Sequence, residues 1–252
     1  MYNKLFIGNQ IVALEEISST NDYLMQLVKS GRTKGEGLVV TAENQTAGKG
    51  QRGSSWESEP GKNIMLSVLL ATKIPADRQF VISKMVSLAI ADCLESFGIP
   101  NVQIKWPNDI YCGKKKMAGI LIENLIREQS LSHTIVGIGL NVNQVDFGEL
   151  GGRATSLAIE SGGAHFDPKD VLDRLLGHLD RYYVKFKTRH AFTLFDADYT
   201  SKLYGWNVVL PFNINGHAKQ AVIRGVDPDG KLCLEFNDER QVFDLKEVEF
   251  LF

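Results

Sequence analysis

The sequence has few cysteines, no histidine cluster and no excess of basic charge. Its 252 residues contain three cysteines, Cys93, Cys112 and Cys233, and no CxxC pair, which argues against a disulfide framework and a structural zinc site. The five histidines form no HxxxH or HxH pair, so a histidine-based metal site is not expected. With 28 Lys and Arg against 30 Asp and Glu, the net charge of −2 argues against a chain that coats nucleic acid or anionic membrane.

Long apolar runs are also missing from the sequence. No stretch approaches the ~18 residues of a membrane span, and the first 20 residues lack the apolar core of a signal peptide. The cytoplasm is therefore the expected compartment. A hydrophobic content of 44% is ordinary for a globular protein. The length of 252 residues predicts one large domain, or one domain with a small second one.

Helical and strand periodicities are segregated along the chain, which favours an α+β fold. Helices are expected over 77–97 and about 168–188, with a shorter one after Ser18-Ser19-Thr20-Asn21. Strands are expected over 11–17, 37–42, 63–70, 102–105, 109–112, 116–123 and 133–142. From about residue 204, short strands separated by turns such as Asn215-Gly216 and Asp229-Gly230 predict a small β-barrel.

A polar, glycine-rich segment at 43–62 is predicted to be a long loop. Its residues Gly48-Lys49-Gly50-Gln51-Arg52-Gly53 spell the dinucleotide fingerprint G-x-G-x-x-G. That fingerprint requires a strand directly before it and a helix directly behind it, and neither is expected here. Three glycines with Lys49 and Arg52 instead suit a phosphate or another anion. A solvated loop without a ligand is the alternative.

Three further segments bring polar groups to strand ends. In Lys105-Trp106-Pro107-Asn108-Asp109, a cation, an amide and a carboxylate converge, unless the segment is only a structural turn. Lys114 and Lys115 suit a solvated hairpin tip, whereas Lys116 adjoins a strand and can hold a carboxylate or phosphate. In GIGLNVN at 137–143, the alternating residues indicate either tight packing or two amides facing a polar ligand.

Five motifs, in this order along the chain, resemble the biotin protein ligase family. They are Ser19-Thr20-Asn21, the run from Gln45 to Gly53 with Trp56, KWPND at 105–109, KMAGIL at 116–121 and GIGLNVN at 137–143. The resemblance implies a mixed β-sheet flanked by helices, akin to class II aminoacyl-tRNA synthetases, followed by an SH3-like β-barrel. It implies a catalytic domain over 1–190 and a barrel domain over 204–252.

The resemblance also implies an ATP-dependent ligase that works in two steps. The carboxylate of biotin would attack the α-phosphate of MgATP, giving biotinyl-5′-AMP and pyrophosphate. A lysine of a biotin carboxyl carrier protein domain would then attack the mixed anhydride and release AMP. Biotin, ATP and Mg²⁺ are thus the expected small molecules. No metal site built from the residues of the chain alone is expected. The expected partner is the biotin carboxyl carrier protein domain of a biotin-dependent carboxylase.

Residue roles in the family transfer onto matching positions of this chain. Lys116, Asp109 and Arg52 are the expected catalytic residues: Lys116 would contact the reacting carboxylate and phosphate, Asp109 would orient or deprotonate the acceptor lysine, and Arg52 would pair with the adenylate phosphate. The expected binding residues are Ser19, Thr20, Asn21, Gln45, Gly48, Lys49, Gly50, Gln51, Arg52, Trp56, Asn108, Lys116, Gly119 and Asn141. The loop 48–53 would close over the ligand and shield the anhydride from water.

The chain departs from the family pattern in three ways. Lys49 stands where the family often has Arg, so the charge is kept and the bidentate fork is lost. Gln51 is neutral at a position that is basic in some members. Only 18 residues precede Ser19, too few for the DNA-binding domain of some members, so this is expected to be a short form without operator binding.

Two other functions fit the same sequence. A lipoate–protein ligase would share the fold and the adenylation chemistry, but the long basic loop and KWPND favour biotin. A non-catalytic binding protein on the same scaffold is disfavoured because Lys116 and both loop cations are present. A homodimer through an exposed edge strand is possible.

Overall fold

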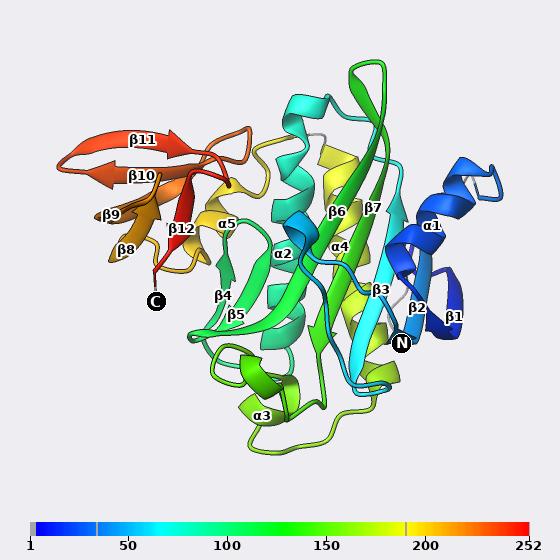
Figure 1. Cartoon of the computed structure of the whole chain (residues 1–252). Helices are drawn as coiled ribbons and strands as arrows, with labels where there is room; N and C mark the ends of the chain where they lie inside the picture. The colour runs from blue at the N-terminus through cyan, green and yellow to red at the C-terminus, as the bar shows by residue number, and fades with distance from the viewer. Residues whose placement is uncertain (1–3, 34, 190, 252) are drawn as a thin grey trace.

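A mixed seven-stranded sheet forms the centre of the protein. The computed structural model describes residues 4–33, 35–189 and 191–251, apart from the side chain of Arg52. The strands are β1 (Gln10–Ile17), β2 (Leu38–Gln45), β3 (Asn63–Leu70), β4 (Val102–Lys105), β5 (Asp109–Cys112), β6 (Lys115–Arg127) and β7 (Ser130–Asn141). Their order is β1-β2-β3-β7-β6-β5-β4, with β1 and β2 parallel and the other neighbours antiparallel (Figure 1).

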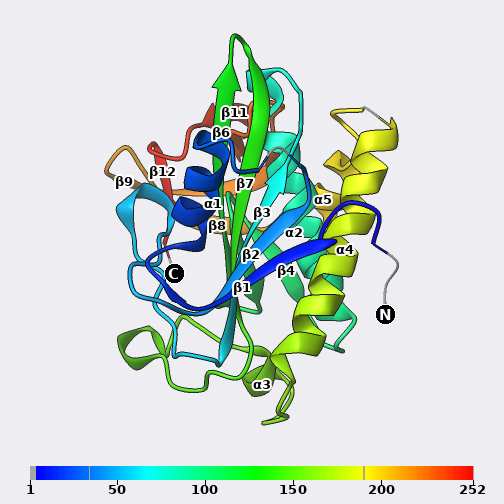
Figure 2. The same ribbon diagram turned by 90° about the vertical axis from the view of Figure 1, so that its right-hand side faces the viewer.

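Helices cover both faces of this sheet (Figure 2). On one face lie α2 (Phe80–Glu95) and α4 (Pro168–Arg189), and on the other lies α1 (Thr20–Lys29). Helix α2 is apolar nearly all round because it is enclosed between the sheet and α4, whereas α4 buries one apolar stripe. Leu24 of α1 packs on Val40 and Leu69 of the sheet. Helix α1 therefore stands directly on the sheet, with its first turn close to β3 and β7.

A separate five-stranded antiparallel sheet follows the helical segment. It contains β8 (Val209–Ile214), β9 (His217–Val226), β10 (Leu232–Phe236), β11 (Glu239–Phe243) and β12 (Val248–Phe250), in the order β11-β10-β9-β8-β12. The α+β fold predicted from the sequence is confirmed. The small barrel appears as this sheet, whose end strands β11 and β12 are not paired with each other within the described residues.

The two sheets share one apolar core. Buried residues of both, such as Ile104 and Phe212, belong to the same hydrophobic cluster. Trp106, which is joined to Pro107 by a cis peptide bond, donates its indole N–H to the backbone carbonyl of Gly230 at 2.8 Å. Ile104 also forms a parallel bridge with Leu203. The division into domains at 1–190 and 204–252 remains a prediction.

Several elements differ in extent from the sequence prediction. Strand β2 continues to Gln45, so the predicted loop at 43–62 begins three residues later and contains a short 3-10 turn, η1 (Gln51–Gly53). Strands β6 and β7 extend into a long hairpin because backbone pairing continues past the buried apolar residues to Arg127 and Ser130. The chain after β7 also forms α3 (Leu157–Glu160) and α5 (Asp196–Ser201). None of the described helices is long and apolar enough to cross a membrane.

Candidate active site

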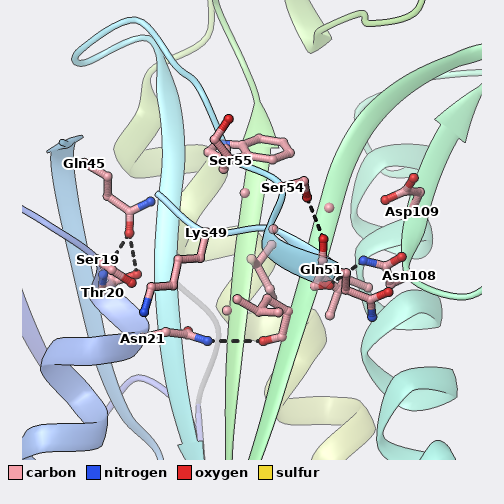
Figure 3. Close-up of a pocket in the computed structure, with 18 of the residues that line it drawn as sticks. Ser19, Thr20, Asn21, Gln45, Lys49, Gln51, Ser54, Ser55, Asn108 and Asp109 are labelled. Atoms are coloured by element: carbon pink, nitrogen blue, oxygen red, sulfur yellow. Dashed lines mark hydrogen bonds between the residues drawn. The ribbon is translucent and has the colours of Figure 1, made fainter. Parts of the chain in front are cut away.

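A cavity of about 200 Å³ opens on the sheet face that carries α1 (Figure 3). Its walls come from the first turn of α1, the end of β2, the loop that follows β2, the start of β5, and parts of β3, β6 and β7. The lining residues are Ser19, Thr20, Asn21, Gln45, Lys49, Gly50, Gln51, Ser54, Ser55, Trp56, Leu66, Asn108, Asp109, Lys116, Gly119, Ile120, Leu121, Gly137, Ile138 and Gly139. Most of the residues predicted from the sequence thus lie together around one space.

The start of α1 and the end of β2 form one end of the cavity. Ser19 is the N-cap of α1, and its hydroxyl accepts from the backbone N–H of Asp22. Thr20 donates to the side-chain oxygen of Gln45 twice, from its backbone nitrogen at 2.8 Å and from its hydroxyl at 3.0 Å (Figure 3). The parallel pairing of β1 with β2 makes this contact possible, because it brings Gln45 opposite Ile17, just before the helix. The remaining amide nitrogen of Gln45 is left as a donor.

Asn21 reaches across the sheet behind this end of the cavity. Its side-chain oxygen accepts from the Ser67 hydroxyl at 2.5 Å, and its nitrogen donates to the Glu123 carboxylate at 2.7 Å. The amide lies over Gly137, where an added Cβ would come 2.5 Å from the Asn21 oxygen. Glycine at 137 therefore provides the space that the Asn21 side chain occupies.

A second row of small residues forms the floor under Trp56. Gly139 pairs with Gly119 across β7 and β6, and Gly119 pairs with Asp109 of β5. A Cβ at Gly139 would come 2.3 Å from the Trp56 ring, and one at Gly119 would come 3.0 Å from it. The two glycines therefore let the indole lie flat on the sheet. The indole N–H is buried and has no hydrogen-bond partner among the described residues.

The opposite end of the cavity holds an ion pair. The ammonium of Lys116 lies 2.6 Å from the Asp109 carboxylate and 5.7 Å from the centre of the Trp56 ring. A register shift after Ile110 places Lys116 beside β5, and its backbone is held by Arg153 and Thr155. A lysine and a carboxylate so placed can meet a reacting anion and a neighbouring amine, respectively.

The neighbouring Lys105 is a partly buried lysine whose pKa is lowered. Its ammonium donates to the Tyr111 hydroxyl at 3.3 Å and stands 5.1 Å from the centres of the Tyr111 and Phe250 rings. Loss of water around this group lowers the pKa of Lys105 below the ordinary lysine value, and the positive charge of Lys116 acts in the same direction. The nearby Asp109 carboxylate opposes that shift.

The loop 46–62 folds back over the cavity as a short hairpin. Lys49 and Ser55 form an antiparallel bridge around η1, and the Trp56 backbone N–H donates to the Gly48 carbonyl at 2.9 Å. Gly48 is needed there because a Cβ would fall 2.5 Å from the Trp56 carbonyl oxygen. The Lys49 ammonium forms an ion pair with Asp22 at 2.7 Å, and the hydrogen bond to Asp22 raises the pKa of Lys49. Lys49 is thus anchored to α1.

Two predicted residues, Gly48 and Asn141, are not part of the lining. Gly48 acts through the turn of the loop, and the side chain of Arg52 lies outside the described part of the chain. Asn141 is buried and donates to the Thr155 carbonyl at 2.9 Å, which ties β7 to the segment before α3. Asn143 bonds the backbone of Phe166 through both ends of its amide. Both asparagines are thus bonded to the backbone of neighbouring segments, and the role of Asn141 near the nucleotide stays a prediction.

Sequence reasoning missed several residues that complete the site. Gly137 and Gly139 were visible as alternating glycines, but only the position of α1 and Trp56 shows what lies over them. Ser67 and Glu123 lie outside the resemblance motifs, and their contacts with Asn21 span 46 and 102 residues of sequence. Among the described residues, no group of three or more His, Cys, Asp or Glu could hold a metal ion.

Comparisons with known proteins identify the family of the chain. The model of the biotin/lipoate A/B protein ligase family matches residues 13–141. The bifunctional ligase/repressor BirA of Bacillus subtilis is 30% identical over 235 residues, 92% of this chain and 71% of that protein. The biotin–acetyl-CoA-carboxylase ligase of Mycobacterium tuberculosis is 30% identical over 250 residues, 96% of this chain and 89% of that protein.

The fold is also similar to that of a solved structure. The biotin protein ligase from Aquifex aeolicus in complex with biotin and ATP has a TM-score of 0.78 at 26% identity, covering 96% of this chain and 98% of that one. Family, relatives and structure all point to the same group of enzymes. The chain belongs to the biotin protein ligases of the biotin/lipoate A/B protein ligase family.

Proposed function

We propose that the chain activates biotin with ATP and transfers it to a lysine of a biotin carboxyl carrier domain. The observation that carries this proposal is the cavity with a hydrogen-bonding network at one end and the Lys116–Asp109 pair at the other. The names of the relatives support it, because they include a biotin–acetyl-CoA-carboxylase ligase. The solved Aquifex structure, which holds biotin and ATP, supports the same pair of substrates.

The spacing of the two rows on the sheet suits an elongated acid. Gly137 lies under the Asn21 network, and Gly139, two residues farther along β7, lies under Trp56 beside the ion pair. Two residues along a strand span about 7 Å. A ring bound at the first row therefore directs its carboxylate tail along the glycine floor towards Lys116.

In the activation step, a carboxylate oxygen of biotin attacks the α-phosphorus of ATP, and the bond to the pyrophosphate oxygen breaks. Negative charge gathers on the phosphoryl oxygens during this displacement. Lys116 stabilises that charge, since its ammonium stands in a partly buried position at the end of the cavity. Trp56 and the loop hairpin exclude water from the anhydride that forms.

In the transfer step, the amine of the acceptor lysine attacks the biotinyl carbonyl carbon, and AMP leaves. The amine must lose a proton to react, and most lysines are protonated near neutral pH. Asp109 accepts or directs this proton once the adenylate phosphate has taken over the contact with Lys116. This role of Asp109 follows from its place beside Lys116.

Magnesium is proposed to enter as part of MgATP. Among the described lining residues, Asp109 is the one carboxylate, and no cluster of acidic ligands accompanies it. This arrangement suits a Mg²⁺ ion held mainly by phosphate oxygens and water. Lys49 and Arg52 are proposed to contact the adenylate, Lys49 after leaving Asp22.

The remaining expectations on location and assembly stay predictions. These are the cytoplasmic location and a homodimer through an edge strand. The division into a catalytic domain and a C-terminal domain also stays a proposal, supported by the two separate sheets.

Incubation with MgATP, biotin and an isolated carrier domain tests the proposed function. Covalent biotin on the carrier, detected by a streptavidin blot and located by peptide mass spectrometry, is the expected result. A carrier with its acceptor lysine replaced by arginine is the matched control and should stay unlabelled. An unmodified wild-type carrier, or modification when lipoate replaces biotin, would contradict the proposal.

A further inference from the structure

We propose that Glu123 is a positioning residue that orients the Asn21 amide from behind and so fixes which groups the cavity offers to the cyclic urea of biotin. Glu123 does not line the cavity, and it contacts Asn21, which does. This inference rests on the proposed function and concerns the discrimination between biotin and other acids.

The contact between the two residues is direct and polar. The Glu123 carboxylate accepts from the Asn21 side-chain nitrogen at 2.7 Å, while the backbone carbonyl of Leu121 lies 3.4 Å from the same nitrogen (Figure 3 shows Asn21). Asn21 is 3% exposed, and Glu123 is half-buried on β6. A buried amide group without a partner is costly, so Glu123 is the group that satisfies this nitrogen.

The carboxylate also decides which way the amide faces. An ionised carboxylate only accepts hydrogen bonds, so it binds the nitrogen end of the Asn21 amide and repels the oxygen end. The oxygen must then face Ser67, whose hydroxyl donates to it at 2.5 Å. An apolar residue at 123 would remove this constraint and leave the Asn21 nitrogen only the more distant Leu121 carbonyl.

The fixed amide sets the direction of the hydrogen bonds beyond it. The Ser67 hydroxyl also lies 2.8 Å from the Thr20 hydroxyl, whose own proton goes to the Gln45 side-chain oxygen. Of these groups, Thr20 and Gln45 line the cavity, so a lone pair of the Thr20 hydroxyl is available to a ligand as an acceptor and the Gln45 nitrogen as a donor. A cyclic urea, with two N–H donors and one carbonyl acceptor, matches this pattern.

The sheet keeps this chain of contacts in register. Ser67, Gly137 and Leu121 are neighbours in one row across β3, β7 and β6, and Glu123 lies two residues beyond Leu121 on the same face. Gly137 leaves the space above this row to the Asn21 amide. Glu123 also adds to the rise in the pKa of Lys49, although the hydrogen bond that Lys49 donates to Asp22 is the larger cause. The carboxylate thus lies within electrostatic reach of the loop that covers the ligand.

The expected consequence is that the site distinguishes between ligands by the hydrogen-bonding groups of their rings. A site whose buried polar groups require hydrogen-bonding partners rejects an analogue that lacks them by a factor of about 10⁴ or more. The dithiolane ring of lipoate offers no N–H donor and no carbonyl. Because Asn21 is held in one orientation, its amide cannot rotate to pair with a polar group that such a ring leaves unpaired. The free-energy cost of binding the ring is therefore higher.

The test compares Glu123→Leu and Glu123→Gln with the wild-type chain by biotin titration calorimetry and by biotin-dependent pyrophosphate exchange. Glu43→Leu is the matched control, since Glu43 is exposed on β2 outside the network. We expect Glu123→Leu to weaken biotin binding by about tenfold or more, because the buried Asn21 nitrogen loses its shorter acceptor and keeps only the Leu121 carbonyl at 3.4 Å. The KM for ATP should stay unchanged, and Glu123→Gln, which keeps an acceptor oxygen, should recover most of the biotin affinity.

Two results would overturn the inference. One is an unchanged biotin affinity in Glu123→Leu, and the other is an equal rise in the KM values for biotin and ATP, which would indicate a general structural role. Should Glu123→Leu fail to fold, Ser67→Ala, which removes the donor at the other end of the same amide, must weaken biotin binding selectively. Wild-type binding of biotin without exchange would contradict the proposed function alone, because the calorimetric comparison does not depend on catalysis.

Discussion

The ammonium of Lys116 and the carboxylate of Asp109 lie 2.6 Å apart at the end of the cavity opposite the Ser19–Asn21 turn (Figure 3 shows Asp109 there). Each is partly buried, with side-chain exposures of 33% for Lys116 and 19% for Asp109. Without substrate, each group neutralises the other. A reacting phosphate would take the place of Asp109 beside Lys116 in the activation step. The Asp109 carboxylate would then be released to act in the transfer step.

Lys116→Ala should abolish most adenylate formation and leave the fold intact. Loss of one preorganised positive group at developing charge lowers a rate by about 10²- to 10³-fold. Pyrophosphate exchange is the measurement, with thermal unfolding as the check on folding. Lys114→Ala is the control, because Lys114 is exposed at the turn before β6. A wild-type exchange rate in Lys116→Ala would exclude the assigned role.

Asp109→Asn should separate the two half-reactions. Asparagine keeps the shape and loses the proton acceptor, so transfer from preformed adenylate to the carrier should fall by about 10²-fold or more. Exchange should fall much less, since Lys116 remains in place. Single-turnover transfer measured beside exchange distinguishes these effects. An equal loss in both would mean that Asp109 acts mainly by holding Lys116.

Gly139→Ala should disrupt the floor of the cavity. The new methyl group would meet the Trp56 ring at 2.3 Å, so either the indole or the strand must move. Overpacking of this kind costs about 1–3 kcal/mol, which corresponds to about 5- to 150-fold weaker biotin binding if the strain appears in the complex. Gly152→Ala is the control, because a Cβ there meets nothing within 4 Å. Equal biotin affinity in both variants, measured by calorimetry, would contradict the role of Gly139.

Lys49→Ala should accelerate the release of the adenylate with little change in stability. The ion pair between Lys49 and Asp22 is exposed at the cavity mouth, and such pairs contribute at most about 1 kcal/mol to folding. Lys49→Arg should retain the adenylate at least as well as the wild type, because guanidinium binds phosphate through two donors. Release of labelled biotinyl-5′-AMP into a trap is the measurement. Identical release from all three chains would show that Lys49 does not contact the adenylate.

Lys105 should make folding stability depend on alkaline pH. Burial lowers its pKa in the folded chain below the ordinary value of 10.5, so the unfolded chain holds the proton more tightly. The stability contributed by this group therefore rises as pH increases from the lowered pKa to 10.5. The free energy of unfolding of the wild type, minus that of Lys105→Met, should increase over this window in urea titrations. A flat difference for Lys105→Met would refute the burial of Lys105 as a charged group.

Much of the site could be predicted because its motifs are local. The Ser19–Asn21 turn, KWPND and the Lys116 strand each combine residues that act within a few positions of one another. Their order along the chain was enough to predict the fold class and most of the cavity lining. The loop was correctly expected to cover the site, and its glycines have distinct steric reasons, as Gly48 under the Trp56 carbonyl illustrates.

The rest depends on contacts that a sequence does not display. Strand alternation does not reveal which side chain crosses above Gly137, and the link from Asn21 to Glu123 joins residues 102 positions apart. Asn141 was expected near the nucleotide from the family resemblance, and the bond from its amide to the Thr155 carbonyl was not predicted. The attachment of Lys49 to Asp22 was equally hidden, since helix α1 and the loop meet only after the sheet has formed.

The most direct test of the account is exchange of labelled pyrophosphate into ATP, with no carrier protein present. The cavity predicts exchange that requires biotin and Mg²⁺ and that stays at background when lipoate replaces biotin. Exchange with lipoate but not biotin, or with neither acid, would contradict the central claim that this cavity activates biotin.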